Sequence, residues 1–317
     1  MKNLKITGFG GNEVLELEES SIPQVKGNQV LVKVACVSLN PLDYKVRSGE
    51  MKMVTGKKFP LSPGYEFAGI IAETGSGARH FQSGQRVFGG TGIKGGALSE
   101  FILAYESDLA AVPDDLSLVK ASTLSVAGLT AWQCLFDKGQ LKKGQRVLLN
   151  GASGGVGSFA TCLAALAGAE TTAFCSNANV DYVTELGADR VFDYNEKKPG
   201  DLSETFDLIF DIASTLDPSE AGRCLNSSGI YVNTLPSPKM FLHQLWTSWQ
   251  SKKIKTFLLK FNRSQAEMLA NKMAGNQWPV QIKAEHSLEK AAEALSELEN
   301  DGIRGKIVVV LDPNFIG

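Results

Sequence analysis

The chain has 317 residues, of which 43% are hydrophobic and 21% charged, and its formal net charge is −2. This is the composition of a soluble globular protein, and the length suggests about two domains. The small net charge gives no overall attraction to nucleic acid, and no apolar run reaches the roughly 18 residues that cross a bilayer. Because the N-terminal stretch lacks the apolar core of a signal peptide, we expect a cytoplasmic protein.

The cysteines are too widely spaced for a disulfide framework or a cysteine-rich zinc site. There are five of them, without any C-x-x-C pair. We therefore expect them to be small buried hydrophobic side chains in a reducing compartment. They are Cys36, Cys134, Cys162, Cys175 and Cys224.

The secondary-structure pattern changes twice along the chain. Residues 1–112 contain short apolar or alternating runs separated by Gly, Pro and Asn, which predicts a small β-barrel. Residues 113–139 predict a helical stretch, opened by Pro113 and two acids and closed by Gly139. After it, apolar runs typical of strands alternate with helical patterns, which predicts βαβ units and a parallel sheet. A last helix and a last strand, KIVVVL, end the chain.

The strongest chemical signal is RVLLNGASGGVGSFATCLAALAG, in which a buried strand runs into a glycine-rich turn and then a helix. Glycine allows a tight turn, a close approach of the backbone to a pyrophosphate and close packing of helix on sheet. The helix N-terminus then offers N–H groups and a positive dipole end to phosphate. Ala152 departs from the G-x-G-x-x-G pattern, but the strand–turn–helix context still predicts a dinucleotide site.

The end of the next strand indicates which dinucleotide is bound. An NAD site has Asp or Glu about 20 residues past the glycines. Here the stretch reads AFCSNANVDY, with Ser176, Asn177 and Asn179 in place of an acid. An acid would repel a 2′-phosphate, whereas Ser and Asn can donate hydrogen bonds to it, so the sequence favours NADP over NAD. The usual basic clamp on that phosphate is missing too.

Three further strings resemble the medium-chain dehydrogenase/reductase superfamily, and most closely its zinc-independent quinone oxidoreductase and enone reductase branch. They are SLNPLDYKVRSG (38–49), AGLTAW (127–132) and GASGGVG (151–157). The resemblance implies an α/β protein with a GroES-like β-barrel catalytic domain and a Rossmann domain with a doubly wound parallel sheet. We assign residues 1–119, completed by 265–317, to the first domain, and residues 120–264 to the NADP-binding domain.

The same resemblance argues against zinc. Zinc members of the superfamily carry a Cys where this chain has Leu39 or Asn40, and His-Glu where it has Tyr65-Glu66. Their structural zinc lobe needs four closely spaced cysteines, and this chain has none in that region. We therefore expect no metal site, and we interpret Glu66 as a structural carboxylate and Tyr65 as a pocket residue.

The resemblance also implies a set of cofactor contacts. Asn179 stands where relatives often have Lys or Arg, and for Lys45 and Arg304 a solvated surface charge is the alternative interpretation. The implied cofactor-binding residues are Lys45, Gly154, Gly155, Val156, Gly157, Ser176, Asn179, Tyr194, Leu235, Arg304 and Gly305.

The implied reaction is hydride transfer from NADPH to a quinone or to the C=C bond of an α,β-unsaturated carbonyl. The protein must then orient the acceptor and donate a hydrogen bond to the oxygen that becomes negative. The candidates are Asn40 for orientation, Thr130 as a nicotinamide-side hydroxyl, and Tyr44 or Tyr65 as donor. Either tyrosine could instead be an aromatic wall, and Asp43 a turn or cap residue.

Two alternatives stay open at this point. A non-catalytic NADPH-binding redox sensor could share the scaffold, since a fold alone does not establish activity. The segment 243–261, with two tryptophans and four lysines, is interpreted as a lid or interface helix followed by a strand, with weak association with a membrane surface as the alternative. We expect small-molecule quinone or enone and enal substrates, no nucleic-acid partner, and a monomer or homodimer.

Overall fold

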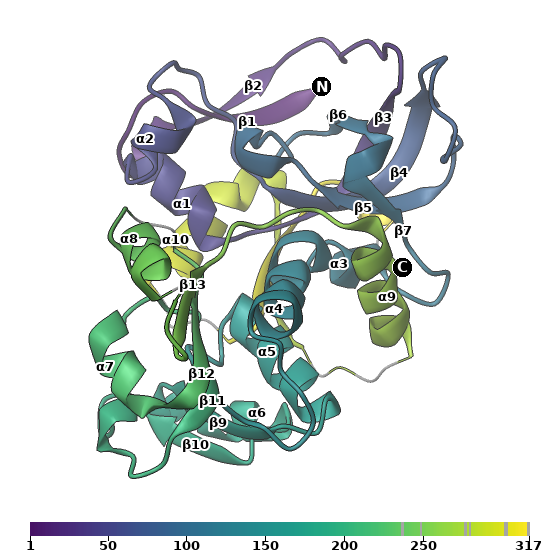
Figure 1. Cartoon of the computed structure of the whole chain (residues 1–317). Coiled ribbons are helices and arrows are strands. Elements are labelled where there is room, and N and C mark those ends of the chain that lie inside the picture. Colours follow the sequence, from purple (N-terminus) through teal and green to yellow (C-terminus); the bar gives the residue numbers. More distant parts are fainter. Residues whose placement is uncertain (236–237, 248, 276–277, 279, 301–303, 316–317) are drawn as a thin grey trace. The chain divides into compact units, whose positions relative to one another are not determined.

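The computed structural model describes residues 1–235, 238–247, 249–275, 278, 280–300 and 304–315, and these form two compact units (Figure 1). Unit 1 comprises residues 1–126, 261–277 and 282–317, and unit 2 comprises residues 127–260 and 278–281. Compactness alone does not test which residues form the catalytic domain and which form the NADP-binding domain. The predicted division into these two functional domains therefore stays a prediction.

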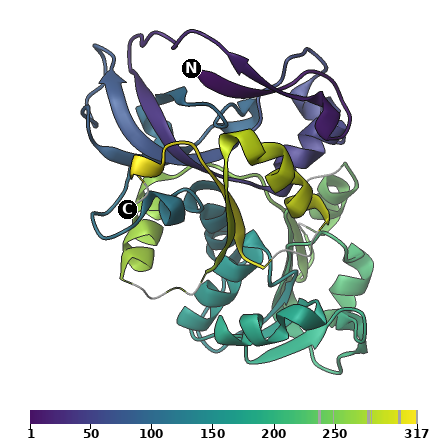
Figure 2. The ribbon, with the colours of Figure 1, turned by 180° about the vertical axis from the view of Figure 1, so that it is seen from behind.

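Unit 1 is built on a sheet that, in the described residues, has the order β14-β15-β3-β4-β5-β7, with β6 also paired to β3. The end of the chain completes this sheet, because β15 pairs with β3 in antiparallel fashion, with Val309 opposite Val37 (Figure 2). β14 and β15 run parallel to each other, and β3, β4, β5 and β7 run antiparallel in sequence. The strands are β3 (Gln29–Ser38), β4 (Glu66–Thr74), β5 (Arg86–Gly90), β6 (Phe101–Tyr105), β7 (Leu109–Ala111), β14 (Ile282–Ser287) and β15 (Lys306–Val310), with a separate pair β1 (Lys2–Ile6) and β2 (Leu15–Glu19).

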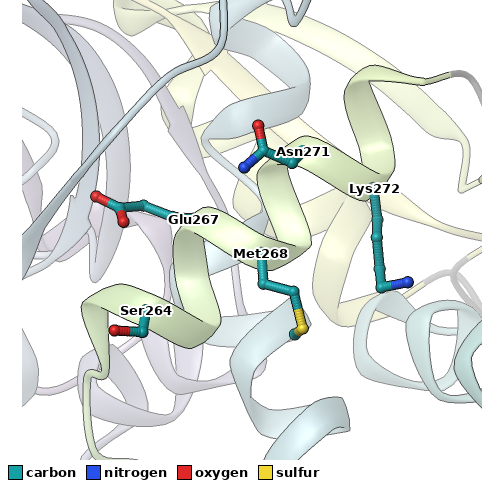
Figure 3. Close-up of a pocket in the computed structure, with 5 residues that line it drawn as sticks. All are labelled: Ser264, Glu267, Met268, Asn271 and Lys272. Atoms are coloured by element: carbon teal, nitrogen blue, oxygen red, sulfur yellow. The ribbon is translucent and has the colours of Figure 1, made fainter.

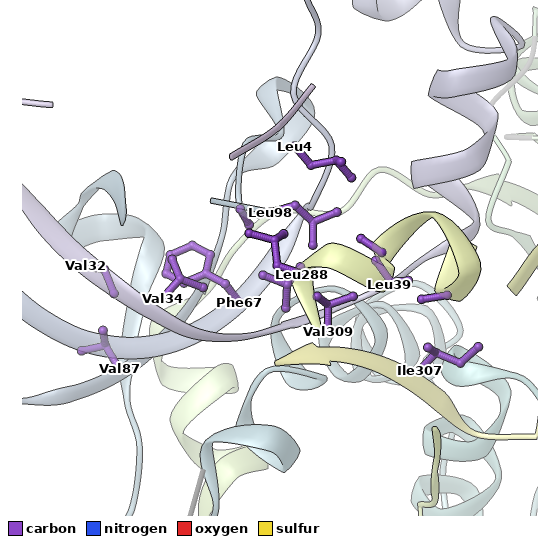
Figure 4. Close-up of a cluster of buried hydrophobic side chains, with 14 of the residues drawn as sticks. Leu4, Val32, Val34, Leu39, Phe67, Val87, Leu98, Leu288, Ile307 and Val309 are labelled. Carbon is purple, nitrogen blue, oxygen red and sulfur yellow. The ribbon is translucent and has the colours of Figure 1, made fainter. Parts of the chain in front are cut away.

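The core of unit 1 lies between these strands and the C-terminal helix (Figure 4). β3 pairs with β4, β6 and β15, so it is buried along almost its whole length, which explains its near-continuous apolar sequence. Phe67 of β4 and Val309 of β15 pack in the same cluster as Leu288 and Leu298. The helices of this unit are α1 (Pro41–Ser48), α2 (Lys52–Thr55), α3 (Leu118–Ala121), α9 (Arg263–Ala274) and α10 (Ala291–Asn300).

Unit 2 contains the predicted parallel sheet, with the order β10-β9-β8-β11-β12-β13 in the described residues. All neighbouring strands in it run parallel. The strand order reverses between β8 and β11, and a ligand of such a sheet binds outside the carboxyl ends of the strands at this point. The strands are β8 (Arg146–Asn150), β9 (Glu170–Cys175), β10 (Arg190–Asp193), β11 (Phe206–Asp211), β12 (Leu225–Asn233) and β13 (Lys253–Thr256).

The helices of unit 2 follow the predicted alternation, which confirms the α/β fold class. They are α4 (Leu129–Trp132), α5 (Gly155–Leu166), α6 (Val180–Glu185), α7 (Pro218–Cys224) and α8 (Pro238–Thr247). The start of the predicted helical stretch at Pro113 was wrong, because Leu116 N donates to Pro113 O in a turn and Ser117 instead caps α3. Two π-helical segments, Leu124–Gly128 and Gln133–Lys138, flank α4.

The cysteines are buried with free thiols, as the sequence predicts. Burial raises the pKa of Cys36 and of Cys162 to about 12, and that of Cys175 to about 11. The thiolate is the reactive form. We expect the native protein to react with a colorimetric thiol reagent only slowly, and the protein unfolded in denaturant to release all five equivalents at once. A rapid stoichiometric reaction of the native protein would contradict this burial.

Candidate active site

The glycine-rich stretch forms the turn between β8 and α5. Gly151 adopts the left-handed region, with φ of +92°. The N–H groups of Gly151 and Ala152 both donate to Phe174 O at 3.0 Å, which ties the turn to β9. A Cβ at Gly157, in the first turn of α5, would lie 2.1 Å from Gly151 O. The turn therefore closes on the helix so tightly that it admits only glycine at this position.

The N-terminus of α5 fits a phosphate group. The helix begins at Gly155, and its N-cap, Gly154, provides no side chain to occupy the N–H groups of the first turn. The position that a Cβ would take at Gly154 has no described atom within 4 Å. Open space therefore lies beside unoccupied N–H groups at the positive end of the helix dipole, an arrangement that suits the pyrophosphate of a dinucleotide.

The residues predicted to reach the 2′-phosphate gather at the ends of β9 and β10. Asn179 is buried, and its Nδ2 donates to Ser176 Oγ at 3.0 Å and to Ser153 Oγ at 3.3 Å. Tyr194 is half exposed, and its N–H donates to Cys175 O. Asn179 therefore connects the glycine-rich turn to the end of β9, and Ser176 and Tyr194 are the hydroxyls that remain near the surface.

A buried carboxylate joins the carboxyl ends of β8, β11 and β12. Asp211 is fully buried; its Oδ1 accepts from Asn150 Nδ2 at 2.7 Å, and its Oδ2 accepts from Tyr231 OH at 2.8 Å. Asn233, at the end of β12, accepts from Leu235 N–H at 2.7 Å through its Oδ1. The polar network thus fixes the strand ends at the switch point and the start of the segment that holds Leu235.

In unit 1 the centre of the candidate site is a buried ion pair. The side chains of Glu66 and Lys306 are 0% and 3% exposed, and Lys306 Nζ lies 2.8 Å from Glu66 Oε1. Asn40 bridges them, since its Nδ2 donates to Glu66 Oε1 at 2.9 Å and its Oδ1 accepts from Lys306 Nζ at 2.9 Å. The remaining oxygen, Glu66 Oε2, accepts from Val126 N–H at 2.7 Å. Glu66 is therefore a structural carboxylate, and the amide of Asn40 suits a positioning role.

Asp43 caps the helix that follows Asn40. Its Oδ2 accepts from Asn40 N–H at 2.8 Å, and its Oδ1 accepts from Gly64 N–H at 2.7 Å. This is the cap role that the sequence left as one of two alternatives. Burial raises the pKa of Asp43 to about 6, although both backbone N–H groups and the Lys306 ammonium act to lower it.

The raised pKa predicts how stability depends on pH. As the pH falls, the folded chain protonates Asp43 near pH 6, before the unfolded chain does so near its ordinary pKa of 3.8. Between these values the contribution of Asp43 to the unfolding free energy rises as the pH falls, by about 3 kcal/mol in total. We expect the wild type to gain stability relative to Asp43→Asn in denaturant titrations from pH 7 to pH 4. A difference that stays constant over this range would contradict the shift.

The two candidate tyrosines lie in different surroundings. Tyr65 is buried in an apolar cluster with Ile6 and Val46. Burial raises its pKa, with a further contribution from the carboxylate of Asp43, so its hydroxyl stays protonated. Tyr44 is half-buried; burial also raises its pKa, but the nearby carboxylates are those of Glu50 and Glu299. Tyr65 is therefore the tyrosine next to the Asp43 and Asn40 cluster.

The remaining predicted residues are distributed over both units. Lys45, on α1, is partly exposed. Thr130 is buried on α4 in unit 2. Arg304 and Gly305 directly precede Lys306, and Gly305 has a φ of +73°. Asn40, Tyr65 and the residues that directly precede β15, Arg304 and Gly305, thus all belong to unit 1.

A surface pocket on α9 contains none of the predicted residues (Figure 3). Its lining comes from one helix alone, so the side chains project from a single face and do not converge on a ligand from several elements. The lining residues are Ser264, Glu267, Met268, Asn271 and Lys272. We assign this pocket no role in the candidate site.

Comparison with known proteins gives the family. The family described as "Alcohol dehydrogenase GroES-like domain" matches residues 26–114, and "Zinc-binding dehydrogenase" matches residues 186–309. A chloroplast envelope quinone oxidoreductase homolog of Arabidopsis thaliana is 31% identical over 98% of both chains. The chain belongs to the medium-chain dehydrogenase/reductase superfamily.

Two further proteins to which this chain is similar indicate its branch of the superfamily. The quinone oxidoreductase of Coxiella burnetii has a TM-score of 0.89 and 28% identity, over 98% of this chain and 99% of that one. The NADPH-dependent alkenal/one oxidoreductase of Arabidopsis thaliana chloroplasts is 32% identical over 68% of this chain and 58% of its own length. The branch to which the sequence is similar is therefore confirmed.

The superfamily includes zinc enzymes, so the fit of a metal to this chain has to be tested on its donor atoms. Zinc in proteins takes Cys, His and carboxylate ligands in a tetrahedral set. In the described ranges no three His, Cys, Asp or Glu side chains lie together in a way that could hold a metal ion. At the Tyr65-Glu66 position, Glu66 is already bound to Lys306, Asn40 and Val126. These residues do not fit zinc.

Lys306 and Asp211 are the important residues that the sequence did not single out. Lys306 opens a strand, where lysine is ordinarily exposed, and its partner Glu66 is 240 residues away in the chain. Asp211 ends the apolar run FDLIFD of β11. An acid at the carboxyl end of a predicted parallel strand in this superfamily was the available signal for Asp211; no local signal marks Lys306.

Proposed function

We propose that this chain is a zinc-independent, NADPH-dependent oxidoreductase that reduces quinones or the C=C bond of α,β-unsaturated carbonyls. The proposal rests on the glycine-rich turn of unit 2 and the helix N-terminus of α5 that follows it. The residues after β9 also support it, because Ser176 and Asn179 stand there in place of the acid of an NAD site. The names of relatives agree with it, since they include quinone oxidoreductases and an alkenal/one oxidoreductase.

In this proposal the residues of unit 2 hold the cofactor. The N–H groups of the first turn of α5, at Gly155, Val156 and Gly157, bind the pyrophosphate. Ser176 and Tyr194 donate hydroxyl hydrogens to the 2′-phosphate, and Asn179 positions Ser176 by donating a hydrogen bond to its Oγ. Leu235, placed by Asn233, and Thr130 belong to the nicotinamide side. NADPH, when bound, supplies the hydride.

The residues of unit 1 act on the acceptor. Reduction places negative charge on the oxygen of the quinone or enone, and a donor preorganised for that oxygen stabilises the transition state by about 3–4 kcal/mol. We propose Tyr65 as this donor, because its raised pKa keeps the phenol protonated and Asp43 accepts a hydrogen bond from the N–H of the preceding residue, Gly64. Lys45, Arg304 and Gly305 are proposed as further cofactor contacts.

The acceptor assay tests the proposal. We expect the protein to oxidise NADPH in the presence of phenanthrenequinone or of a short 2-alkenal, followed by the loss of nicotinamide absorbance. Turnover of the quinone alone would favour the quinone reductase, and turnover of the alkenal the enone reductase. Tight NADPH binding without turnover of either acceptor would instead support the alternative, a non-catalytic NADPH-binding redox sensor.

A pair of variants tests the donor. Tyr65→Phe removes the proposed hydroxyl and keeps the ring, so we expect kcat to fall by about 100-fold with little change in NADPH affinity. Tyr44→Phe is the matched control, since Tyr44 faces other carboxylates. Unchanged turnover of Tyr65→Phe would assign that ring to the wall of the acceptor site.

We also propose a cytoplasmic location and a monomeric or homodimeric state. Across the described residues, no helix has the length and apolar character needed to span a bilayer. A cytoplasmic location stays a prediction, because relatives include chloroplast and mitochondrial proteins. Monomer or homodimer likewise stays a prediction.

A further inference from the structure

Helix α8 in unit 2 has its polar side chains on the inside. Gln244 Oε1 accepts from Thr256 N–H at 2.8 Å, and Thr247 Oγ1 accepts from Ile254 N–H at 3.0 Å. Met240, one turn earlier on the same side, is buried in the core of the unit. The helix thus uses one face, at spacings of four and three residues, to hold β13 (Figure 1).

The opposite face of α8 is apolar and exposed. Leu242 is 69% exposed, Trp246 is 75% exposed and Trp249, just past the helix, is 94% exposed. An isolated exposed apolar residue is ordinary on a protein surface, whereas a group of exposed apolar side chains at helical spacing, followed in the sequence by a second exposed tryptophan, marks a binding surface. We call the five exposed apolar residues of this group the α8 face: Phe241, Leu242, Leu245, Trp246 and Trp249.

The segment around this face is strongly basic. Residues 221–260 contain six Lys and Arg and no Asp or Glu, in a chain whose net charge is −2. Lys253 and Lys260 are exposed, and Lys252 lies next to Lys253 with its Nζ donating to Gly222 O. Exposed tryptophan, leucine and lysine side chains within one short segment are typical of elements that lie in the interface of an anionic membrane.

A second copy of the chain fits this surface less well. β13 is the terminal strand of the sheet in the described residues, but its outward N–H groups at Ile254 and Thr256 already donate to α8. Addition of a partner strand at that edge would have to break these bonds. Contact between two α8 faces would also bring two basic segments together, which like-charge repulsion opposes.

We propose that the α8 face binds an anionic lipid surface. Trp246 and Trp249 enter the headgroup region together with Leu242, and Lys253 contacts the anionic headgroups. None of these residues is among the proposed cofactor and acceptor residues.

Vesicle flotation of the full chain tests this directly. The wild type is expected to float with phosphatidylcholine vesicles that contain about 30% phosphatidylserine, and to stay in solution with pure phosphatidylcholine, since the charge of the leaflet supplies part of the attraction. Raised salt is expected to weaken the binding because the lysines are exposed. Absence of flotation with anionic vesicles would overturn the proposal.

Three variants separate lipid from other occupants. Trp246→Ser with Trp249→Ser, and separately Lys253→Glu, are each expected to weaken vesicle binding by about tenfold or more. Met53→Ser, which changes a 91% exposed apolar residue of unit 1, is the matched control and is expected to bind as the wild type does. Equal loss in Met53→Ser would overturn the assignment to α8. If the tryptophan variant instead changed the mass in light scattering and the wild type did not float, the face would be a contact between copies.

Discussion

Gly157→Ala is expected to destabilise the protein by about 3 kcal/mol and to weaken NADPH binding by at least about 100-fold. The added Cβ would lie 2.1 Å from Gly151 O and 2.6 Å from Ala152 C. Both are backbone atoms of the turn that precedes α5, so neither can move without opening the proposed phosphate site. Denaturant unfolding and a fluorescence titration with NADPH measure the two effects.

Two other glycines provide the controls. Gly200→Ala adds a Cβ that meets no described atom within 4 Å, far from the turn in sequence, and is expected to change neither quantity. Gly154→Ala adds a Cβ into open space at the N-cap of α5, so it is expected to keep full stability and still weaken NADPH binding. Full NADPH affinity in both Gly154→Ala and Gly157→Ala would exclude this turn as the phosphate site.

Lys306→Met is expected to cost about 3–5 kcal/mol of unfolding free energy, because it leaves the buried Glu66 carboxylate without its counter-ion. Lys306 Nζ donates to Leu39 O, Asn40 Oδ1 and Glu66 Oε1 within 2.9 Å, so three acceptors lose a donor at once. Urea unfolding at neutral pH measures this loss.

A double-variant cycle separates the ion pair from general damage. Adding Glu66→Gln to Lys306→Met removes the isolated charge, so we expect a coupling energy of about 1–3 kcal/mol. Lys2→Met breaks the exposed pair with Glu289 and is expected to leave the unfolding midpoint nearly unchanged. Additive effects of the Glu66 and Lys306 changes would show that the two side chains do not depend on each other.

The nucleotide loop was predictable because its signal is local. The strand, the glycines and the helix occupy one continuous stretch. The glycines are needed there for a tight turn, for close approach of the backbone to a pyrophosphate and for close packing of the helix on the sheet. Gly157 and Gly151 meet in the structure as that pattern predicts. The alternation of strands and helices after residue 139 likewise predicted the parallel sheet of unit 2.

The acceptor side could be predicted only in part. Asp43 and Tyr44 are adjacent on α1, so their side chains project about 100° apart, yet the sequence could not say which one faces the Asn40 cluster. The Lys306–Glu66 pair joins two strands through sheet pairing over a long separation, which a single sequence does not encode locally. The inward polar face of α8 depends on the edge of β13, and that edge too is a tertiary feature.

The proposed function requires this chain to transfer hydride from NADPH to an acceptor without a metal. The most direct measurement is steady-state NADPH oxidation with phenanthrenequinone, before and after exhaustive dialysis of the protein against a strong chelator, with NADH as the comparison donor. We predict unchanged kcat after dialysis and a higher kcat/KM with NADPH than with NADH. Activity that disappears on chelation and returns with zinc, or a preference for NADH, would contradict the account.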